Sequence, residues 1–210
     1  MTDYPADIHT EQADIDPDTL ANLGPLRGLA GTWRGTKGLD INPNVDGSGR
    51  QGFIETIDLQ PIDPQSNGPQ LLYGLRYHLN ALKPDDPQTY HDQVGYWLWE
   101  PATGLILHSL TIPRGQAVLA AGHAAADAKS FEVSARRGET EYGIVSTSFL
   151  EYAFRTDAFR MQVTINDADS WSYFEETTLV VRGQDKPFAH TDRNTLVRIA
   201  QPTPNPLARI

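Results

Sequence analysis

The chain has 210 residues, and its 17 basic and 27 acidic side chains give a net charge of −10. It contains no cysteine, which excludes disulfides, thiolate metal sites and a cysteine nucleophile. The acidic balance argues against nucleic acid and anionic membranes as partners. No apolar run is long enough to span a bilayer and no secretory signal is visible, so a cytoplasmic location is expected.

Residues 1–19 are expected to be a flexible acidic leader. Asp18 or Thr19 is a suitable N-cap for a short helix that contains Leu20, Leu23 and Leu26 and packs across one mouth of the domain. A single β-domain is expected over residues 20–200, because domains of this length often remain undivided.

Short strands with turn residues between them fill this domain. The expected strands are Gly31–Lys37, Phe53–Pro61, Gln70–Ala81, Tyr90–Glu100, Leu105–Thr111, Gln116–Gly122, Ser130–Arg136, Tyr142–Ser146, Ala158–Asn166, Trp171–Val181 and Thr191–Ala200. The segment 35–52 is rich in Gly, Asn and Asp and is expected to be a long loop. Only Phe149–Arg155 has a helical pattern, and residues 201–210 are expected to form an extended, proline-rich tail.

Alternation along the strands indicates the fold. Tyr73, Leu75 and Tyr77 fall on one face, and Gly74 and Arg76 fall on the other. Period-2 patterning with hairpin turns is typical of half-buried antiparallel strands in a meander. The sequence therefore predicts an all-β, antiparallel, up-and-down closed barrel of about ten strands with a short N-terminal helix. A two-sheet sandwich is the alternative architecture.

Trp33 lies on the first strand and Arg198 on the last. In a closed barrel these strands are neighbours, so the guanidinium can lie over the indole and close the floor, a cation–π contact worth about 0.5–2 kcal/mol. The alternative is that Trp33 is simply a core residue.

Three segments together resemble a known family. They are Leu29–Gly35 with Gly-Thr-Trp-Arg-Gly, Tyr90–Tyr96 with His91 and Gly95-Tyr96, and Phe188–Arg198 with His190 and Leu-Val-Arg at its end. In this order they resemble the nitrobindin-like haem-binding β-barrels. These are calycin-like or lipocalin-like domains that are also described as fatty-acid-binding-protein-like. The similarity covers about residues 26–199.

The resemblance implies that haem b is held at one mouth by a single histidine at the start of the last strand. It also implies binding of nitric oxide and haem-dependent isomerisation of peroxynitrite. By position, His190 would ligate the haem iron and His91 would lie on the distal side. One departure is visible, because His190 precedes Leu196 by six residues and Thr191 occupies the expected position of the ligand. A bulge near Asp192 would restore the direction of the side chain.

The residues themselves indicate a cavity wall. His91 shares a strand face with Gln93, Trp97 and Trp99, a mixture of aromatic surface and polar groups that suits a ligand pocket, and Leu110 is a further apolar wall residue. The alternative is a packed aromatic core. His108 is expected to be a satisfied core histidine, and His78 is expected to face solvent or a polar interior rather than to be a ligand. The alternative for His190 and Asp192 is that they only cap the start of a strand.

Glu175 and Glu176 are adjacent on one strand, so one of them must point into a closed barrel. A buried carboxylate requires a partner, and Arg160, Arg76 and Arg34 are the expected ones. Because the two glutamates face opposite ways, a glycosidase pair is disfavoured.

Three functions are weighed. The first is a nitrobindin-like barrel that binds haem or another small apolar molecule. The second is a carrier of fatty acids or similar lipids without catalysis, in which an internal Arg76 or Arg160 holds the carboxylate. The third is a barrel filled by its own side chains. No catalytic residue is assigned.

Overall fold

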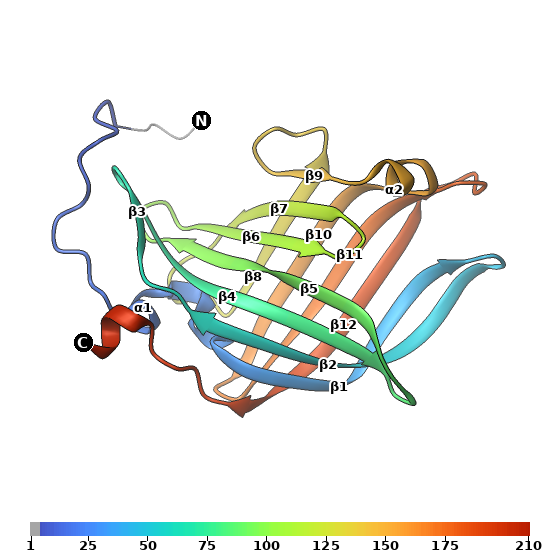
Figure 1. Cartoon of the computed structure of the whole chain (residues 1–210), viewed down its shortest axis with the longest axis horizontal. Coiled ribbons are helices and arrows are strands. Elements are labelled where there is room, and N and C mark those ends of the chain that lie inside the picture. The colour runs from blue at the N-terminus through green and yellow to red at the C-terminus, as the bar shows by residue number, and fades with distance from the viewer. Residues whose placement is uncertain (1–4) are drawn as a thin grey trace.

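The computed structural model describes residues 5–210 and shows a β-barrel (Figure 1). Its elements are α1 Thr19–Asn22, η1 Gly24–Leu29, β1 Gly31–Asn44, β2 Gly47–Pro61, β3 Gln65–Asn67, β4 Gln70–Lys83, β5 Asp86–Glu100, β6 Leu105–Ile112, β7 Gln116–His123, β8 Ser130–Arg137, β9 Gly143–Val145, α2 Ser148–Ala153, β10 Phe154–Asp167, β11 Ser170–Val181, β12 Phe188–Ala200 and η2 Pro206–Arg209.

The sheet closes on itself. Its strand order is β2-β1-β12-β11-β10-β8-β9-β7-β6-β5-β4-β3, and a further pairing of β2 with β4 completes the ring. The first and last strands, β1 and β12, are antiparallel neighbours. β3 pairs with β4, while the short β9 lies between β7 and β8 and runs parallel to β8. The predicted all-β closed barrel of about ten strands is confirmed.

The prediction of a long loop over residues 35–52 is wrong. β1 and β2 form one hairpin whose pairing runs from Gly31 opposite Leu59 to Asn44 opposite Gly47. Glycine and asparagine are typical of turns, but in this segment they lie in a ladder that continues to the tip. The hairpin extends past the rest of the barrel wall and is the long pair of strands at the right of Figure 1.

One end of the barrel is covered by the N-terminal helices. Asp18 caps α1, because its carboxylate accepts a hydrogen bond from the Ala21 amide at 3.2 Å. Leu23, Leu26 and Leu29 then point into the barrel and are fully buried. The predicted cap and its short helix are confirmed, and we call this the closed end.

Trp33 and Arg198 form the floor of the closed end. The guanidinium carbon of Arg198 lies 4.1 Å from the centre of the Trp33 ring, so the predicted cation–π contact is confirmed. The Trp33 indole is fully buried, donates a hydrogen bond to the Leu29 carbonyl at 2.7 Å and packs edge-on against Trp171.

The C-terminal segment also binds to the closed end. Asn205 is fully buried, accepts a hydrogen bond from the Thr19 amide, and donates to the Pro17 carbonyl and to Asp63 at 2.8 Å each. Residues 201–210 thus connect the leader of α1 to the chain between β2 and β3, and they finish in η2.

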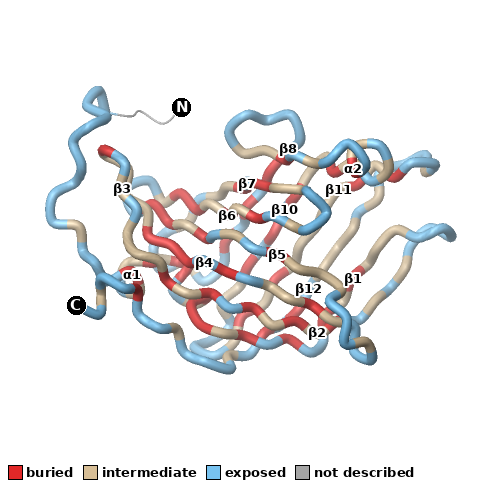
Figure 2. The backbone as a smooth tube through the Cα atoms, viewed as in Figure 1, coloured by how far each residue is buried: buried red, intermediate tan, exposed pale blue. Residues whose placement is uncertain are grey.

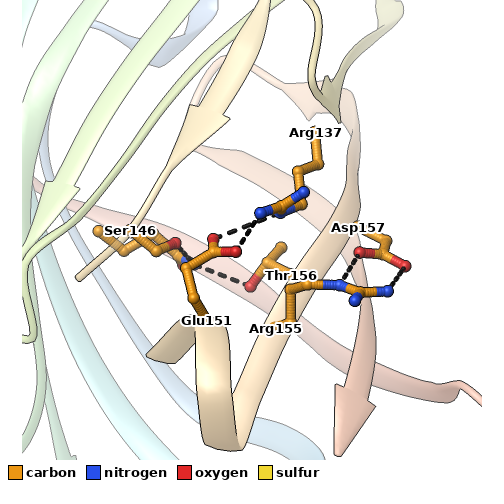
Figure 3. A network of polar contacts seen from close by, with 7 residues as sticks. Arg137, Ser146, Glu151, Arg155, Thr156 and Asp157 are labelled. Atoms are coloured by element: carbon orange, nitrogen blue, oxygen red, sulfur yellow. Dashed lines mark hydrogen bonds and ion pairs between the residues drawn. The ribbon is translucent and has the colours of Figure 1, made fainter. Parts of the chain in front are cut away.

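The opposite end carries α2, which confirms the helix expected near Phe149–Arg155. The Arg182 amide donates to the Ala153 carbonyl at 3.0 Å, so α2 lies beside the β11–β12 connection. Figure 3 shows Glu151 of α2 facing Arg137 at the end of β8, with which it forms an ion pair. We call this the open end, since among the described residues no element crosses it as α1 and η1 cross the other.

The two ends differ in what points inward. Buried segments fill the wall next to α1, whereas the hairpin tips at the open end are exposed (Figure 2). Near the closed end the inward residues are apolar, including Leu75, Ile106, Val163 and Leu196. Along the same strands the inward residues become polar toward the open end. The barrel therefore has an apolar closed half and a polar open half.

Candidate functional site

The last strand brings His190 into the open half. His190, Asp192, Asn194 and Leu196 lie on one face of β12, because alternate residues of a strand point the same way and Leu196 is fully buried. The β11–β12 ladder is continuous from Leu196 to His190, so no bulge occurs near Asp192. His190 points inward because it precedes Leu196 by an even number of residues, and Thr191 lies on the outer face.

His190 lies between two carboxylates. Its Nε2 is 3.0 Å from Oδ1 of Asp40 and 3.4 Å from Oδ2 of Asp192. Asp40 comes from β1 and is paired with Asp192 in the β1–β12 ladder. One ligand-type atom from each of the three residues lies within 4.8 Å of the others. We call these three residues the Asp–His–Asp cluster.

Asp40 is held rigidly from two further directions. Its Oδ2 accepts hydrogen bonds from the Tyr90 hydroxyl and from the Asn42 amide, the latter at 2.8 Å. Tyr90 lies at a bulge of β5, since Ala81 of β4 pairs with His91 but the next residue pairs with Thr89. Bulges re-aim side chains in this way. Only 2% of the Asp40 side chain is exposed, so its orientation is fixed by these partners.

Sequence reasoning missed Asp40 because it fell in the supposed loop 35–52. A signal was present: Leu39 and Ile41 flank it and Asn42 follows, which is the alternation of a strand. Tyr90 belongs to one of the three segments that resemble the family, but nothing in the sequence indicates its contact with Asp40. Two strands, β2 and β4, lie between the strands of these residues in the sheet.

Two glutamates complete the polar lining. Glu175 is opposite Asp192 in the β11–β12 ladder and points inward, and its carboxylate forms no hydrogen bond or ion pair with any residue among those described. Glu55 of β2 is 1% exposed and accepts hydrogen bonds from the Tyr173 hydroxyl at 3.0 Å and the Asn194 amide at 2.8 Å. Burial outweighs these bonds and raises the pKa of Glu55 to about 7.

Electrostatics in the open half favour positive charge. Burial alone would lower the pKa of His190, but the Asp40 hydrogen bond and the charges of Asp192, Asp40 and Glu175 outweigh it and raise that pKa. Burial raises the pKa of Asp192 and that of Glu175, and neighbouring carboxylates raise them further. Among residues 5–210, no lysine or arginine forms an ion pair with these carboxylates.

The second predicted histidine faces the same space from β5. The Nε2 of His91 donates to the Gln93 side-chain oxygen at 3.2 Å, and the Gln93 amide donates to the Tyr77 hydroxyl at 2.6 Å. The Tyr77 hydroxyl in turn lies 3.0 Å from Nε2 of His108. Burial lowers the pKa of His91, and the charge of His190 lowers it further, so the two histidines lie within electrostatic range of each other.

The predicted aromatic wall lies in the closed half instead. Trp97 stacks on His108 with ring centres 3.9 Å apart, Trp99 packs against Gly24 of η1, and Leu110 is 5% exposed. These side chains pack against other core residues and fill the interior of the closed half. His108 is a core residue as predicted, although its Nδ1 has no partner, so it is only half satisfied.

Residues of the open half are enclosed and yet accessible. Glu175 points into the barrel and is partly exposed. The side chains of His190 and Asp192 are likewise deep, and 28% and 23% of them are exposed. These inward-pointing polar groups are therefore within reach of solvent. A separate hollow of about 1050 Å³ lies against the wall beside β9 and includes none of these residues.

The arginines expected inside the barrel are outside it, so that prediction is wrong. Arg34, Arg76 and Arg160 are all exposed on the outer face. Arg160 lies 3.3 Å from Glu132 and 3.9 Å from Glu176, the outward member of the glutamate pair. Outer positions alternate with inner ones, and a charged arginine is more stable in water than in a cavity without a partner.

Taken together, the geometry defines a closed β-barrel with a filled half and a ligand-accessible half. The model of the THAP4-like, heme-binding beta-barrel domain matches residues 22–198, and the chain belongs to this family. A similar solved structure is that of Rv2717c from M. tuberculosis, with 22% identity and a TM-score of 0.62 over 88% of this chain and 99% of that one. No curated protein matches. No helix within residues 5–210 is long and apolar enough to cross a membrane.

Family membership raises the question of whether these residues fit haem. A haem ligand needs a neutral imidazole with Nε2, the nitrogen farthest from the backbone, directed at the iron. In this structure Nε2 of His190 is hydrogen-bonded to Asp40 and also faces Asp192 as an ion pair, and its raised pKa favours the protonated ring. The residues do not fit haem ligated through His190.

Proposed function

We propose that this protein binds a small cationic ligand in the open half of its barrel, with the Asp–His–Asp cluster and Glu175 as contacts. The observation that carries the proposal is that His190, Asp192 and Glu175 point into the barrel and remain partly exposed, beside the buried carboxylate of Asp40. A preformed cavity with a few convergent polar groups is the usual form of a small-molecule site.

The sign of the ligand's charge follows from the lining. Asp40, Asp192, Glu175 and Glu55 supply four carboxyl groups, and the imidazole of His190 contacts the first two of them. An anion would have to approach this set of acids, whereas an ammonium group or a cation replaces the protons that the acids hold. The same argument disfavours the fatty-acid carrier, since its anchoring arginines lie outside.

The nitric oxide and peroxynitrite chemistry implied by the family resemblance needs haem iron. Because His190 is held by carboxylates, we do not extend that chemistry to this chain. Haemin remains a necessary probe, since it separates the family's ligand from the one proposed here.

The test uses two probes of similar size and opposite charge, n-propylammonium and butyrate. Imidazole signals of His91 and His190 are followed by NMR in the full chain while each probe is added, with His78 and His123 as outer-surface controls. We expect n-propylammonium to shift the signals of His91 and His190 only, and butyrate to shift neither.

Two outcomes would contradict the proposal. One is a shift with butyrate and none with n-propylammonium, which would favour the lipid-type carrier. The other is a sharp Soret band on adding haemin that His190→Ala abolishes and His78→Ala leaves intact, which would show haem ligation through His190.

A further inference from the structure

We propose that Asp40, His190 and Asp192 form a binding site for a divalent transition-metal ion, independent of haem, with Glu175 as a neighbouring carboxylate that balances the charge of the ion. This inference rests on the proposed function and deepens it by naming the cation. The metal would lie in the open half of the barrel, at the place where Nε2 of His190 faces the two aspartates.

The spacing of the donor atoms suits a small metal ion. Zinc binds imidazole nitrogen and carboxylate oxygen at about 2.0–2.2 Å in tetrahedral geometry, which places the ligand atoms roughly 3.3–3.6 Å from one another. Nε2 of His190 lies 3.0 Å from Asp40 and 3.4 Å from Asp192. Small side-chain shifts are therefore enough to admit an ion among the three, in place of the imidazole proton.

Asp40 is already prepared as a ligand. Its Oδ2 accepts hydrogen bonds from Tyr90 and Asn42, which leaves Oδ1 directed at His190. Outer partners that hold a carboxylate in one orientation are typical of metal sites. This arrangement restricts Asp40 more than a simple ion pair requires, since Tyr90 reaches it from β5, and β2 and β4 lie between the two strands in the sheet.

Glu175 supplies the observation that is independent of the cluster. Its carboxylate is enclosed in the barrel, lies opposite Asp192 in the ladder, and has no hydrogen-bond or ion-pair partner among the described residues. An enclosed carboxylate needs a partner, and the nearby groups are mostly acids. A cation at the cluster provides that partner.

The ligand set selects the kind of metal. One imidazole with two or three carboxylates suits zinc, manganese or ferrous iron, whereas magnesium and calcium prefer oxygen ligands alone. For one such site the affinity for Zn²⁺ exceeds that for Mn²⁺. We therefore expect Zn²⁺ to bind more tightly than Mn²⁺, and Mg²⁺ in excess to compete with neither.

The chain offers a matched control on its outer wall. His78 lies 3.0 Å from Asp92, the same contact as that between His190 and Asp40, but the His78 side chain is 56% exposed and is absent from the cluster. If a histidine–aspartate pair alone were enough to bind Zn²⁺, both pairs would do so.

The test is calorimetric titration of the full-length, chelator-treated protein with ZnCl₂ and then MnCl₂. We expect one Zn²⁺ per chain, an affinity lowered at least about tenfold by His190→Gln and by Asp192→Asn, and no change in His78→Gln. Glu175→Gln should weaken binding without abolishing it. Zn²⁺ should also raise the unfolding temperature of the wild type and of His78→Gln, and of the cluster variants less.

The results separate the two proposals. No saturable Zn²⁺ binding, or binding that both His190→Gln and Asp192→Asn retain, overturns the metal site. If n-propylammonium still shifts the His190 signal in that case, the cationic pocket stands without the metal. If His190→Gln does not fold, as circular dichroism would show, Asp192→Asn and Glu175→Gln decide the question.

Discussion

The closed and open halves of this barrel are built from the same strands but differ in what those strands point inward. On β12, Leu196 is fully buried near the floor, and six residues earlier His190 faces an accessible space. On β5, Trp97 stacks in the core and His91 faces the open end. The backbone ladder is common to both halves, so side-chain identity alone makes one half a core and the other a site.

This difference explains how the open half can be lined by polar groups while the protein remains folded. The closed half contains most of the hydrophobic cluster, including Trp33, Trp97 and Trp171. In the open half, Glu55, Glu175 and Asp192 are kept near other acids, which lowers stability. The filled half therefore supplies the stability that the site lacks.

The largest expected effect is in the closed half. Trp33→Ala should lower the free energy of unfolding by about 3–5 kcal/mol, because it removes a fully buried indole and leaves a cavity. Urea denaturation measures the loss, with Thr177→Ala in the open half as a control that should change stability little. A loss below about 1 kcal/mol for Trp33→Ala would mean that the floor is not the stabilising region.

A fall in pH should lower the stability of the protein through His108 in the closed half. Burial lowers the pKa of His108 to about 3, against 6.5 when unfolded, so the folded state resists protonation. Its contribution to stability is complete above pH 6.5 and is lost as the pH falls toward 3, at up to about 1.4 kcal/mol per pH unit. Relative to His108→Gln, the wild type should lose roughly 3 kcal/mol between pH 6.5 and 4 in urea denaturation. Parallel pH profiles would contradict this.

A rise in pH should lower the stability of the protein through Glu55 in the open half. Its folded pKa of about 7 exceeds the model-compound value of 4.5, so the folded state holds a proton that the unfolded chain releases. The contribution of Glu55 to stability is present below pH 4.5 and is lost as the pH rises to 7. The free energy of unfolding of Glu55→Gln, relative to that of the wild type, should therefore rise by roughly 2–3 kcal/mol between pH 4.5 and 7. An unchanged difference across this range would show that the carboxyl titrates normally.

The smallest of these effects concerns the floor contact. Arg198→Lys keeps the charge but loses the planar stacking on Trp33 and the hydrogen bond to the Ala168 carbonyl. We expect a loss of about 1 kcal/mol in the free energy of unfolding. Arg193→Lys, at an exposed position on the same strand, is the control, and an equal effect in both variants would remove the special role of the Trp33 contact.

The closed half was the more predictable of the two from sequence. Alternation such as that of Tyr73, Leu75 and Tyr77 gives the inner face directly, and the pairing of Trp33 with Arg198 follows once the barrel closes. Trp97 was placed on the correct face, but sequence cannot tell a packed indole from a pocket wall. That distinction depends on what fills the space opposite, which in this case is His108.

The open half was predicted only in part. His190, His91 and one inward glutamate were found from strand alternation and family resemblance. Asp40 was missed because glycines and asparagines around it suggested a loop, and the arginine partners proposed for Glu175 lie outside. Contacts such as that of Tyr90 with Asp40 join distant strands, and their geometry depends on a bulge that no local pattern encodes.

The acidic surroundings of His190 are the central claim, and an NMR titration of the histidine side chains tests it most directly. We predict a pKa above 6.5 for His190, because Asp40, Asp192 and Glu175 stabilise its charged form, and a pKa below 6.5 for His91, because burial outweighs its hydrogen bond to the neutral amide of Gln93. Asp192→Asn should lower the His190 value. A His190 pKa below 6.5 that Asp192→Asn does not change would contradict the account.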